Sequence, residues 1–475
     1  MDRMQTFLHH ELTLIHDASM QILKETGVNF NDEETVDLFR AHGFRTDGKK
    51  VYFRENDILK AIQNTPSKFT VHARNPEKSA AVGEGAFVYL PTGGAPNVMM
   101  ADGTMRPGTL SDFINCCKLV QTSEQLDIGG YLMVQPNDVP ESVAHLHMMQ
   151  NYLSLCDKPL FGASATSQAA RDTIDIIALF FGGLENIKKM PVMISVVNSA
   201  SPLQYSGDQA RVILTMAEYN QPLVIANMVL AGASGPVDLP GLLALQNAET
   251  LAGITLAQLV SPGCPVVYGS TSAPMDMKTM CSAVGASETL KVANATIQLA
   301  NHYNLPSRCG GSLTDAHVPD AQALAEGALM LSSVVRKGAN VIYHACGQLG
   351  SYISMSFEKW LIDEEVCQTV RQMIEPMEIT RDTIDVTQIH EVGNGGQYLT
   401  HPKTFLQFKS LSQPRFFNRK DFYKWHAGGF KRIDQTASEA LVQRLEDYEK
   451  PPIDPGIETA LKEFTLRRER EILGE

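Results

Sequence analysis

The sequence predicts an α/β protein built on a (β/α)8 TIM barrel, and three features of its 475 residues support this fold. Short apolar segments alternate with longer amphipathic segments over residues 86–360, an order typical of a parallel sheet covered on both faces. Eight such strand–helix units can be counted, which is the number that the barrel requires. Several apolar segments begin with a proline, and at a strand start its missing N–H interrupts no sheet hydrogen bond.

The expected strands are residues 87–90, 128–134, 160–163, 192–198, 223–227, 266–269, 307–310 and 341–344. Helices are expected between and after them at 111–123, 142–155, 168–181, 206–219, 239–260, 282–303 and 320–337. An open doubly wound sheet is the alternative fold. Such a sheet usually has a GxGxxG phosphate turn after its first strand, whereas this chain has Thr92-Gly-Gly-Ala-Pro96 there.

Helical extensions are expected on both sides of the barrel, which divides the chain into residues 1–85, 86–360 and 361–475. In the first extension, helical spacing predicts a helix that ends at Gly27, followed by helices over 33–42 and 55–64. In the last part of the chain, helices are expected over 355–373, 434–448 and 457–473.

Composition excludes several classes of protein. The 40 Lys and Arg against 53 Asp and Glu give a net charge of −13, which argues against a general nucleic-acid binder. No apolar stretch reaches the roughly 18 residues of a membrane helix, and charged residues interrupt the first segment where a signal peptide would lie. The eight cysteines form no CxxC motif and mostly lie in apolar segments, which is typical of reduced thiols in a cytoplasmic protein.

Chemistry is expected at the carboxyl ends of the strands, where barrel enzymes place their active sites. These ends hold neutral amides, hydroxyls and aromatic rings, and few carboxylates. Asn198 and Asn227 end two consecutive strands, so their amides either point into one cavity or cap the helices that follow. Hydrolase and nucleotide-binding motifs such as GxSxG, HExxH and the P-loop are absent from the sequence.

Aromatic residues gather near the same predicted rim. Aromatic faces attract cations, and quaternary ammonium groups are favoured ligands of aromatic cages. The alternative is that each ring only packs in the core. The rings concerned are Tyr89, Tyr268, Tyr343, Tyr352, Phe357 and Trp360.

One segment contains a metal-like pattern, His344-Ala-Cys346. Zinc requires three or four nitrogen or sulfur ligands. Cys309 and Cys367 are the residues that would have to complete such a site, whereas a neutral histidine that hydrogen-bonds substrate or backbone needs no further partner. We therefore expect no metal site, and keep a zinc site as the alternative.

Several ordered segments resemble the trimethylamine:corrinoid methyltransferase superfamily, and within it the members that lack pyrrolysine. The similarity extends over essentially the whole chain. It is found at residues 15–19, 26–28, 269–278, 305–311, 314–315, 320–322, 338–344, 356–359 and 363–365.

This resemblance implies a TIM barrel enzyme that moves a methyl group from an amine nitrogen to the Co(I) of a corrinoid held by a cognate partner protein. It implies no permanently bound cofactor, because the cobalamin belongs to that partner. The chain contains only standard residues, with no pyrrolysine around 309–315, which points away from trimethylamine and towards glycine betaine, proline betaine or carnitine. A zinc-dependent corrinoid methyltransferase and a non-catalytic betaine-binding relative are the alternatives, and a homo-oligomer is left open.

Roles for single residues follow from these expectations. Aromatic residues are assigned to the ammonium cage, namely Tyr89, Tyr352, Phe357 and Trp360. Polar residues are assigned to the carboxylate or hydroxyl of the substrate, namely Asn198, Asn227 and His344, with Arg308 as an alternative carboxylate partner. Asp315 is expected to orient the substrate or to balance its positive charge, so Asp315 and His344 are the expected catalytic residues.

Overall fold

The computed structural model describes residues 6–411 and 413–474. Eight parallel strands form the central sheet in the order β6-β19-β18-β15-β13-β11-β10-β9. Their bounds are β6 Val88–Tyr89, β9 Gly129–Gly130, β10 Leu160–Phe161, β11 Met193–Val197, β13 Leu223–Asn227, β15 Val266–Ser270, β18 Ser307–Gly310 and β19 Val341–Tyr343. The two ends of the sheet meet just before β9, where the Asp127 backbone N–H donates to the carbonyl of Tyr89 in β6 at 3.0 Å. The sheet is therefore a closed barrel, and the predicted fold class is confirmed.

Side chains alternate between the inside of the barrel and the surrounding helices, as the pleat of a strand requires. The interior core includes Val88, Leu90, Phe161, Val224 and Tyr343. The residues between them in sequence, such as Tyr89 and Ile225, belong instead to the larger core under the helices. This alternation determines which of the predicted site residues point into the barrel interior.

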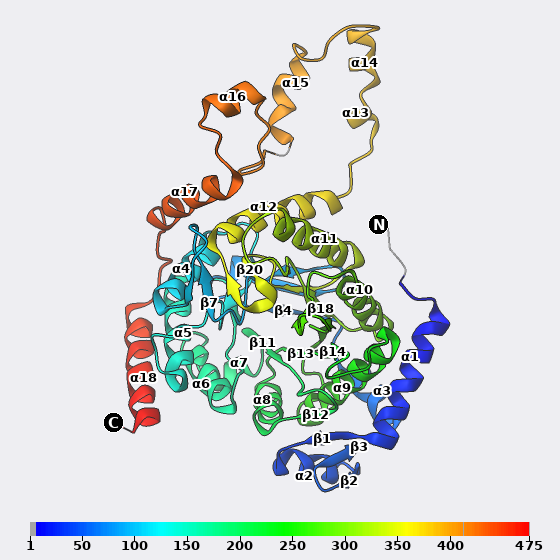
Figure 1. Ribbon diagram of the computed structural model, residues 1–475. Helices are drawn as coiled ribbons and strands as arrows, with labels where there is room; N and C mark the ends of the chain where they lie inside the picture. Colours follow the sequence, from blue (N-terminus) through cyan, green and yellow to red (C-terminus); the bar gives the residue numbers. More distant parts are fainter. Residues whose placement is uncertain (1–5, 412, 475) are drawn as a thin grey trace.

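A ring of helices surrounds the strands (Figure 1). They are α4 Leu110–Thr122, α5 Glu141–Leu155, α6 Ser167–Ala178, α8 Gly207–Glu218, α9 Leu239–Val260, α10 Ser287–His302, α11 Ala321–Lys337 and α12 Phe357–Ile374. Side-chain caps begin several of them, since Thr109 accepts from the Asp112 N–H at α4 and Ser356 from the Lys359 N–H at α12. Each predicted barrel helix therefore has an observed counterpart, and α12 runs across the expected boundary at residue 360.

The N-terminal extension contains the three predicted helices, α1 His9–Gln21, α2 Glu33–Ala41 and α3 Glu55–Asn64. It also contains short strands that the sequence analysis did not predict, namely β1 Val28–Phe30, β2 Arg45–Asp47, β3 Lys50–Tyr52, β4 Lys68–Val71 and β5 Ala80–Gly83. With three or four residues each, these strands are too short to show an alternating pattern. The β4–β5 hairpin closes one end of the barrel, because Val71 and Val82 pack into its interior core.

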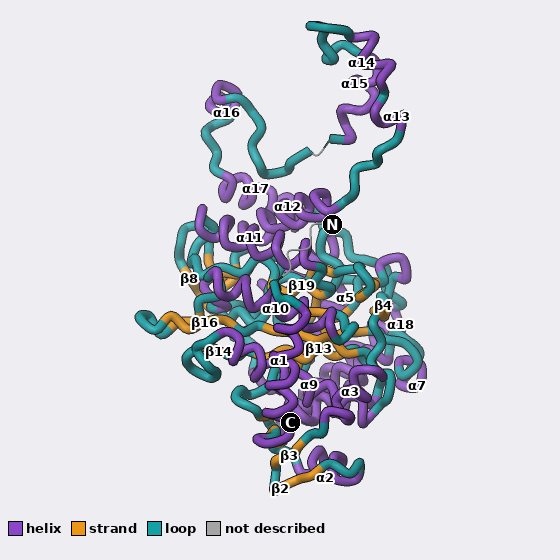
Figure 2. Tube along the Cα trace, turned by 90° about the vertical axis from the view of Figure 1, so that its right-hand side faces the viewer, coloured by secondary structure: helices purple, strands orange, loops and turns teal. Residues whose placement is uncertain are grey.

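The C-terminal part returns to the barrel through α17 Ile433–Glu446, which packs on α12, and α18 Pro455–Leu473, which packs on α5. Residues 375–432 lie between α12 and α17 and project away from the barrel, and we call this segment the arm (Figures 1 and 2). Its described residues form the short α-helices α13 Arg381–Ile384, α14 Val386–Val392, α15 Pro402–Gln407 and α16 Phe422–Ala427, with a 3-10 turn at Phe408–Ser410. The described helices lack the combination of length and hydropathy that a membrane span requires.

Candidate functional site

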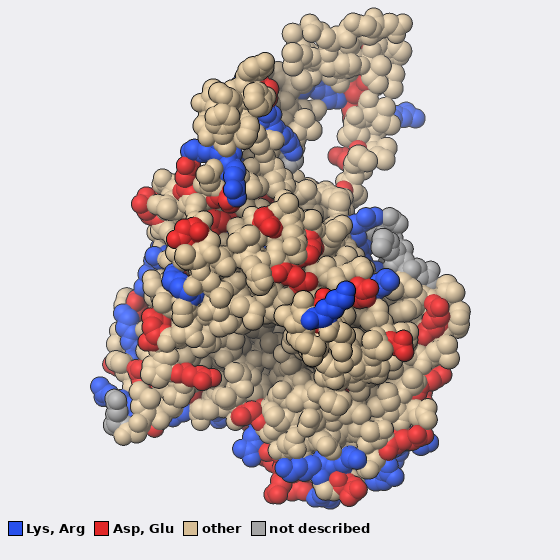
Figure 3. Space-filling view, in the orientation of Figure 1, with Lys and Arg blue, Asp and Glu red and all other residues tan. Residues whose placement is uncertain are grey.

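The open end of the barrel lies where the parallel strands end, opposite the β4–β5 hairpin. Two small sheets lie around this open end, with the strand orders β20-β21-β7-β8 and β14-β16-β17. Their strands are β7 Asn97–Met99, β8 Met105–Pro107, β14 Leu230–Ala231, β16 Ala273–Asp276, β17 Cys281–Ser282, β20 Gln348–Leu349 and β21 Ser354–Met355. Figure 3 shows a hollow in this face, and the atoms visible inside it belong to neither charged class. We call this hollow the mouth.

A buried arginine is the dominant charge of the mouth. Arg308 lies on β18 and is 1% exposed, and its guanidinium Nη1 donates to the Ser270 carbonyl at 2.7 Å. Its Nε has no hydrogen-bond partner, and no carboxylate forms an ion pair with it among the described residues. Burial lowers the pKa of this guanidinium, yet arginine remains protonated in proteins. The barrel therefore holds a positive charge without a counter-ion from its own side chains.

Three rings lie beside this guanidinium. The Arg308 carbon Cζ is 5.2 Å from the centre of the Tyr343 ring. The His344 ring stacks on Tyr343 with a centroid distance of 4.0 Å, and the Tyr352 ring meets His344 edge-on at 5.0 Å. Burial raises the pKa of Tyr352 to about 12, and its hydroxyl is buried without a partner. We refer to Arg308, Tyr343, His344 and Tyr352 as the mouth cluster.

Backbone conformation explains why His344 and Tyr352 can both reach the mouth. Both residues have positive φ angles, 62° and 78°, which are uncommon for residues with a side chain. The chain therefore leaves the regular strand path directly after Tyr343. Such turns leave no periodic pattern in the sequence. The sequence does show that polar and aromatic residues are frequent in the segment after Tyr343.

His344 is a neutral hydrogen-bonding group. Its Nδ1 lies 3.2 Å from Gln348 Oε1, which also accepts from the Thr92 hydroxyl at 2.7 Å. The Gln348 amide nitrogen donates to the Ser354 carbonyl, so its oxygen faces His344 and the proton resides on Nδ1. Burial, with the nearby charge of Arg308, holds the pKa of His344 well below its usual value. Its Nε2 is thus left as an acceptor.

Asp315 lies near Tyr352 but is fully engaged by the chain itself. Its carboxylate accepts from the backbone N–H groups of Val284 and Gly285 at 2.9 and 3.0 Å, and from the Ser351 hydroxyl. These bonds tie the segment before α10 to the loop that presents Tyr352. The arrangement gives Asp315 a positioning contact to the mouth cluster through Ser351.

The two asparagines predicted to bind substrate lie in different environments. Asn198 follows β11 in line with the inward-facing Ile194, and it is exposed at the mouth. Asn227 faces outward and is buried, where its amide donates to the Gln246 carbonyl and the Thr250 hydroxyl of α9 at 2.7 and 2.8 Å. Asn227 therefore joins β13 to the middle of α9, which is neither a helix cap nor a contact to the mouth.

The remaining predicted cage residues also lie apart from the mouth cluster. Tyr89 faces outward, because Val88 and Leu90 face inward, and the guanidinium of Arg371 lies 4.4 Å from its ring. Trp360 is fully buried and donates from Nε1 to Glu364 at 3.1 Å. Phe357 begins α12 and packs in the core under the helices. Of the four predicted cage aromatics, Tyr352 alone belongs to the mouth cluster, while Tyr343, noted only as a rim residue, also belongs to it.

The residues that would form the alternative zinc site do not come together around one point. Cys346 and Cys367 face each other between β19 and α12 with 3.9 Å between their sulfurs. Cys309 Sγ contacts the Ala293 carbonyl of α10, and His344 is turned to the mouth. Within residues 6–411 and 413–474, no group of three or more His, Cys, Asp or Glu side chains has the geometry to hold a metal ion. The ligand set that this alternative needs is therefore not assembled.

A (β/α)8 barrel with a buried cation and a wall of rings at the carboxyl ends of its strands defines a barrel enzyme that binds a small organic molecule. The chain belongs to the trimethylamine methyltransferase (MTTB) family, whose model matches residues 1–473. It is accordingly a methyltransferase.

Similar proteins agree with this assignment. A glycine betaine methyltransferase of Desulfitobacterium hafniense (strain Y51) is 36% identical over 459 residues, which are 96% of each chain. A trimethylamine methyltransferase MttB of Methanosarcina thermophila is 30% identical over 95% of each chain. Among solved structures, the monomethylamine methyltransferase MtmB of Methanosarcina barkeri aligns with a TM-score of 0.52 at 12% identity, over 93% of this chain and 98% of that one. The last similarity shows the fold alone.

Proposed function

We propose that this enzyme transfers a methyl group from a quaternary amine with a carboxylate, of the glycine betaine type, to the Co(I) of a corrinoid held by a cognate partner protein. The products are methyl-Co(III) and a tertiary amine. The observation that supports this substrate class best is the buried, unpaired guanidinium of Arg308 beside three rings.

The carboxylate is assigned to Arg308. A buried charge is costly unless it is paired, and the described residues supply no carboxylate to this guanidinium. A substrate carboxylate would pair with it through charge-assisted hydrogen bonds. Trimethylamine has no carboxylate and would leave the guanidinium unpaired, which argues for a betaine as substrate.

The ammonium end is assigned to the rings of Tyr343, His344 and Tyr352, with Asn198 at the rim as a further polar contact. Aromatic faces stabilise a quaternary cation. His344 is suited to this end, because its Nε2 is an acceptor and its neutral ring adds no positive charge. The earlier assignment of His344 to the carboxylate is thereby replaced, since an acceptor nitrogen does not bind a carboxylate.

The reaction demands little chemistry from these side chains. The methyl carbon is attacked in line by Co(I), whose electron pair forms the Co–C bond, while the C–N electron pair remains on nitrogen. A neutral tertiary amine leaves without a proton, so no general acid is required. The mouth cluster then has two tasks, to hold the N–CH3 axis towards the approaching corrinoid and to exclude water. Asp315 acts as a positioning residue through Ser351 and the loop of Tyr352.

Two further points belong to this proposal. The relative with the highest identity among those described above is a glycine betaine methyltransferase, which supports a betaine over trimethylamine. We also propose a cytoplasmic location, which is supported by eight free cysteines, seven of them buried.

Exchange of Arg308 for Met tests the carboxylate assignment. Loss of one partner of a buried charge pair costs about 2–5 kcal/mol, so we expect glycine betaine binding, measured by calorimetry, to weaken at least about 30-fold. Choline has the same ammonium group without a carboxylate, and its weak binding should not fall. Thermal unfolding checks that the variant is folded, and Arg308→Lys should retain part of the affinity. Unchanged betaine affinity in a folded Arg308→Met variant would contradict the proposal.

A further inference from the structure

The arm has no hydrophobic core of its own. From residue 375 to 432, apart from Ser412, which lies outside the described residues, every side chain is exposed or half-buried. Of the 29 large apolar residues that are exposed in the described chain, 14 lie in these 58 positions. They are Met377, Ile379, Ile384, Val386, Ile389, Tyr398, Leu399, Phe405, Leu406, Phe408, Leu411, Phe422, Tyr423 and Phe430.

This exposure is too large for a surface that stays in water. With six aromatic rings among them, the 14 side chains present an apolar area on the order of 1,000 Å². A soluble monomer rarely exposes a contiguous apolar patch of more than a few hundred Å². A stable protein interface buries roughly 1,200–2,000 Å² in total. The apolar area of the arm is therefore that of one side of a stable protein interface.

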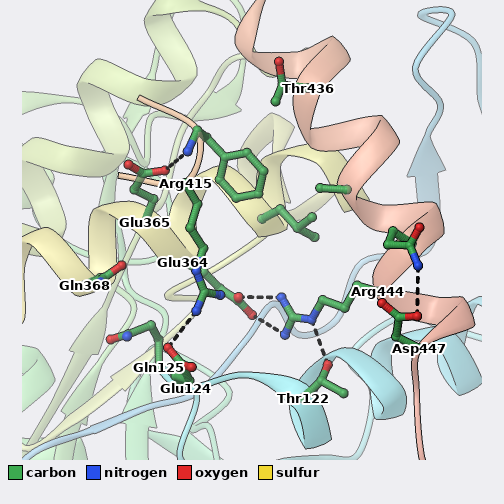
Figure 4. A pocket seen from close by; sticks show the side chains of 14 residues that line it. Thr122, Glu124, Gln125, Glu364, Glu365, Gln368, Arg415, Thr436, Arg444 and Asp447 are labelled. Carbon is green, nitrogen blue, oxygen red and sulfur yellow. Dashed lines mark hydrogen bonds and ion pairs between the residues drawn. The ribbon is translucent and has the colours of Figure 1, made fainter. Parts of the chain in front are cut away.

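The arm is nevertheless held firmly at its base. The buried carboxylate of Glu365 on α12 accepts from the backbone N–H groups of Phe416 and Phe417. Arg415 pairs with Glu124 at 2.8 Å, as Figure 4 shows. These contacts fix where the arm leaves the barrel, so its apolar residues are presented at a defined place.

Space remains open next to this base. A cavity of about 480 Å³ lies between α4, α12 and α17, with Leu361, Phe416 and Ala440 among its lining (Figure 4). A second cavity of about 730 Å³ lies between residues 413–420 and α17. Both are open to solvent, so the surface beside the base of the arm is hollowed and accessible to another chain.

Charge is unevenly divided between the arm and the rest of the chain. The arm has nine Lys and Arg against six Asp and Glu, whereas the remaining residues have 31 against 47. Residues 403–432 alone contain eight basic residues and one acidic residue. A basic, apolar segment on an acidic protein is complementary to another copy of that protein.

We infer that the arm is an assembly element, which binds a second copy of this chain and is covered by it permanently. The corrinoid protein is the other occupant to consider, and here the choice rests on the proposed function. That partner must leave the mouth after each methyl transfer, and its departure would return the whole apolar arm to water. Permanent interfaces are the strongly apolar ones, so a second copy suits the arm better than a transient partner.

The mass of the purified full chain tests this inference, and it requires no methyl transfer. Light scattering after gel filtration at micromolar concentration should give a multiple of the 52.1 kDa chain mass. A variant with Phe405→Ser, Leu406→Ser, Phe422→Ser and Tyr423→Ser should elute as a 52.1 kDa monomer with the barrel still folded. The matched control exchanges Leu14 and Leu329 for Ser, which are similarly exposed outside the arm, and should remain assembled.

Amide hydrogen exchange of the unmodified chain provides a second readout. Exchange in α13 to α16 should slow as protein concentration rises, while exchange in the barrel strands should not change. A monomeric mass of the unmodified chain at micromolar concentration would overturn the inference. So would an arm that becomes protected only when the corrinoid protein is added.

Discussion

The barrel and the arm differ in how each uses its apolar residues. In the barrel, strands of two to five residues are buried on both faces, inside by the interior core and outside by the helices. In the arm, helices of four to seven residues present Phe, Leu and Ile side chains to solvent. The two regions nevertheless meet at α12, since Glu365 of that helix holds the arm.

This difference separates two sources of stability. The barrel is stabilised by burial within one chain, and its mouth holds a guanidinium without a carboxylate partner beside three rings. The arm lacks such burial and depends on another chain. Changes in the barrel should consequently affect unfolding or substrate binding, whereas changes in the arm should affect assembly.

The two tryptophans provide the largest contrast, since Trp360 lies in the barrel layer and Trp425 in the arm. Trp360→Ala should lower the free energy of unfolding by about 3–5 kcal/mol, because it empties a fully buried site. Trp425→Ala should change the unfolding of the barrel by no more than about 0.5 kcal/mol. Denaturant unfolding of both variants, followed by circular dichroism, measures the difference. Equal losses of unfolding free energy in the two variants would contradict the difference between barrel and arm.

A smaller effect is expected at the mouth. Tyr352→Ala removes one ring next to His344 and should weaken glycine betaine binding by about 0.5–2 kcal/mol. Tyr352→Phe keeps the ring and should bind nearly as well as the unmodified enzyme. The oligomeric mass should be the same for both variants. If removal of the ring leaves the affinity intact, the ammonium group lies elsewhere.

The smallest effect is expected at the junction. Glu365→Gln weakens the acceptor for the Phe416 and Phe417 N–H groups and should cost about 1 kcal/mol locally. Hydrogen exchange should rise at residues 413–420 and remain unchanged in the barrel strands. A matched exchange at the exposed Glu378 of the arm should alter neither region. Faster exchange throughout the barrel would show that the two regions unfold together.

The sequence predicted the barrel well because buried parallel strands appear as continuous apolar segments separated by amphipathic helices. The sequence did not predict which face of a strand a given side chain occupies. Strand β6 has two residues, too few to show that Tyr89 points outward. The side chain of Asn227 faces α9, because Ala226 before it faces inward, and the uniformly buried strand β13 gave no polar alternation from which this could be predicted.

Other features depend on contacts that no local pattern records. The positive φ angles of His344 and Tyr352 place both rings in the mouth, and the bond of Gln348 to Thr92 joins residues 256 positions apart. The arm is a further case, because its short helices contact one another but bury no side chain among the described residues, and they show no long amphipathic period. Arg308, in contrast, could be singled out from the sequence as the charged residue of a predicted barrel strand.

The central claim is that this methyltransferase demethylates a betaine with a corrinoid as acceptor. The direct measurement mixes the enzyme with a corrinoid protein reduced to Co(I) and follows the Co(I) absorbance after each amine is added. The account predicts stoichiometric loss of Co(I) with glycine betaine or a related carboxylated quaternary amine, with one demethylated product per methyl-Co(III), and no loss with trimethylamine. Robust reaction with trimethylamine, and none with glycine betaine, proline betaine or carnitine, would contradict it.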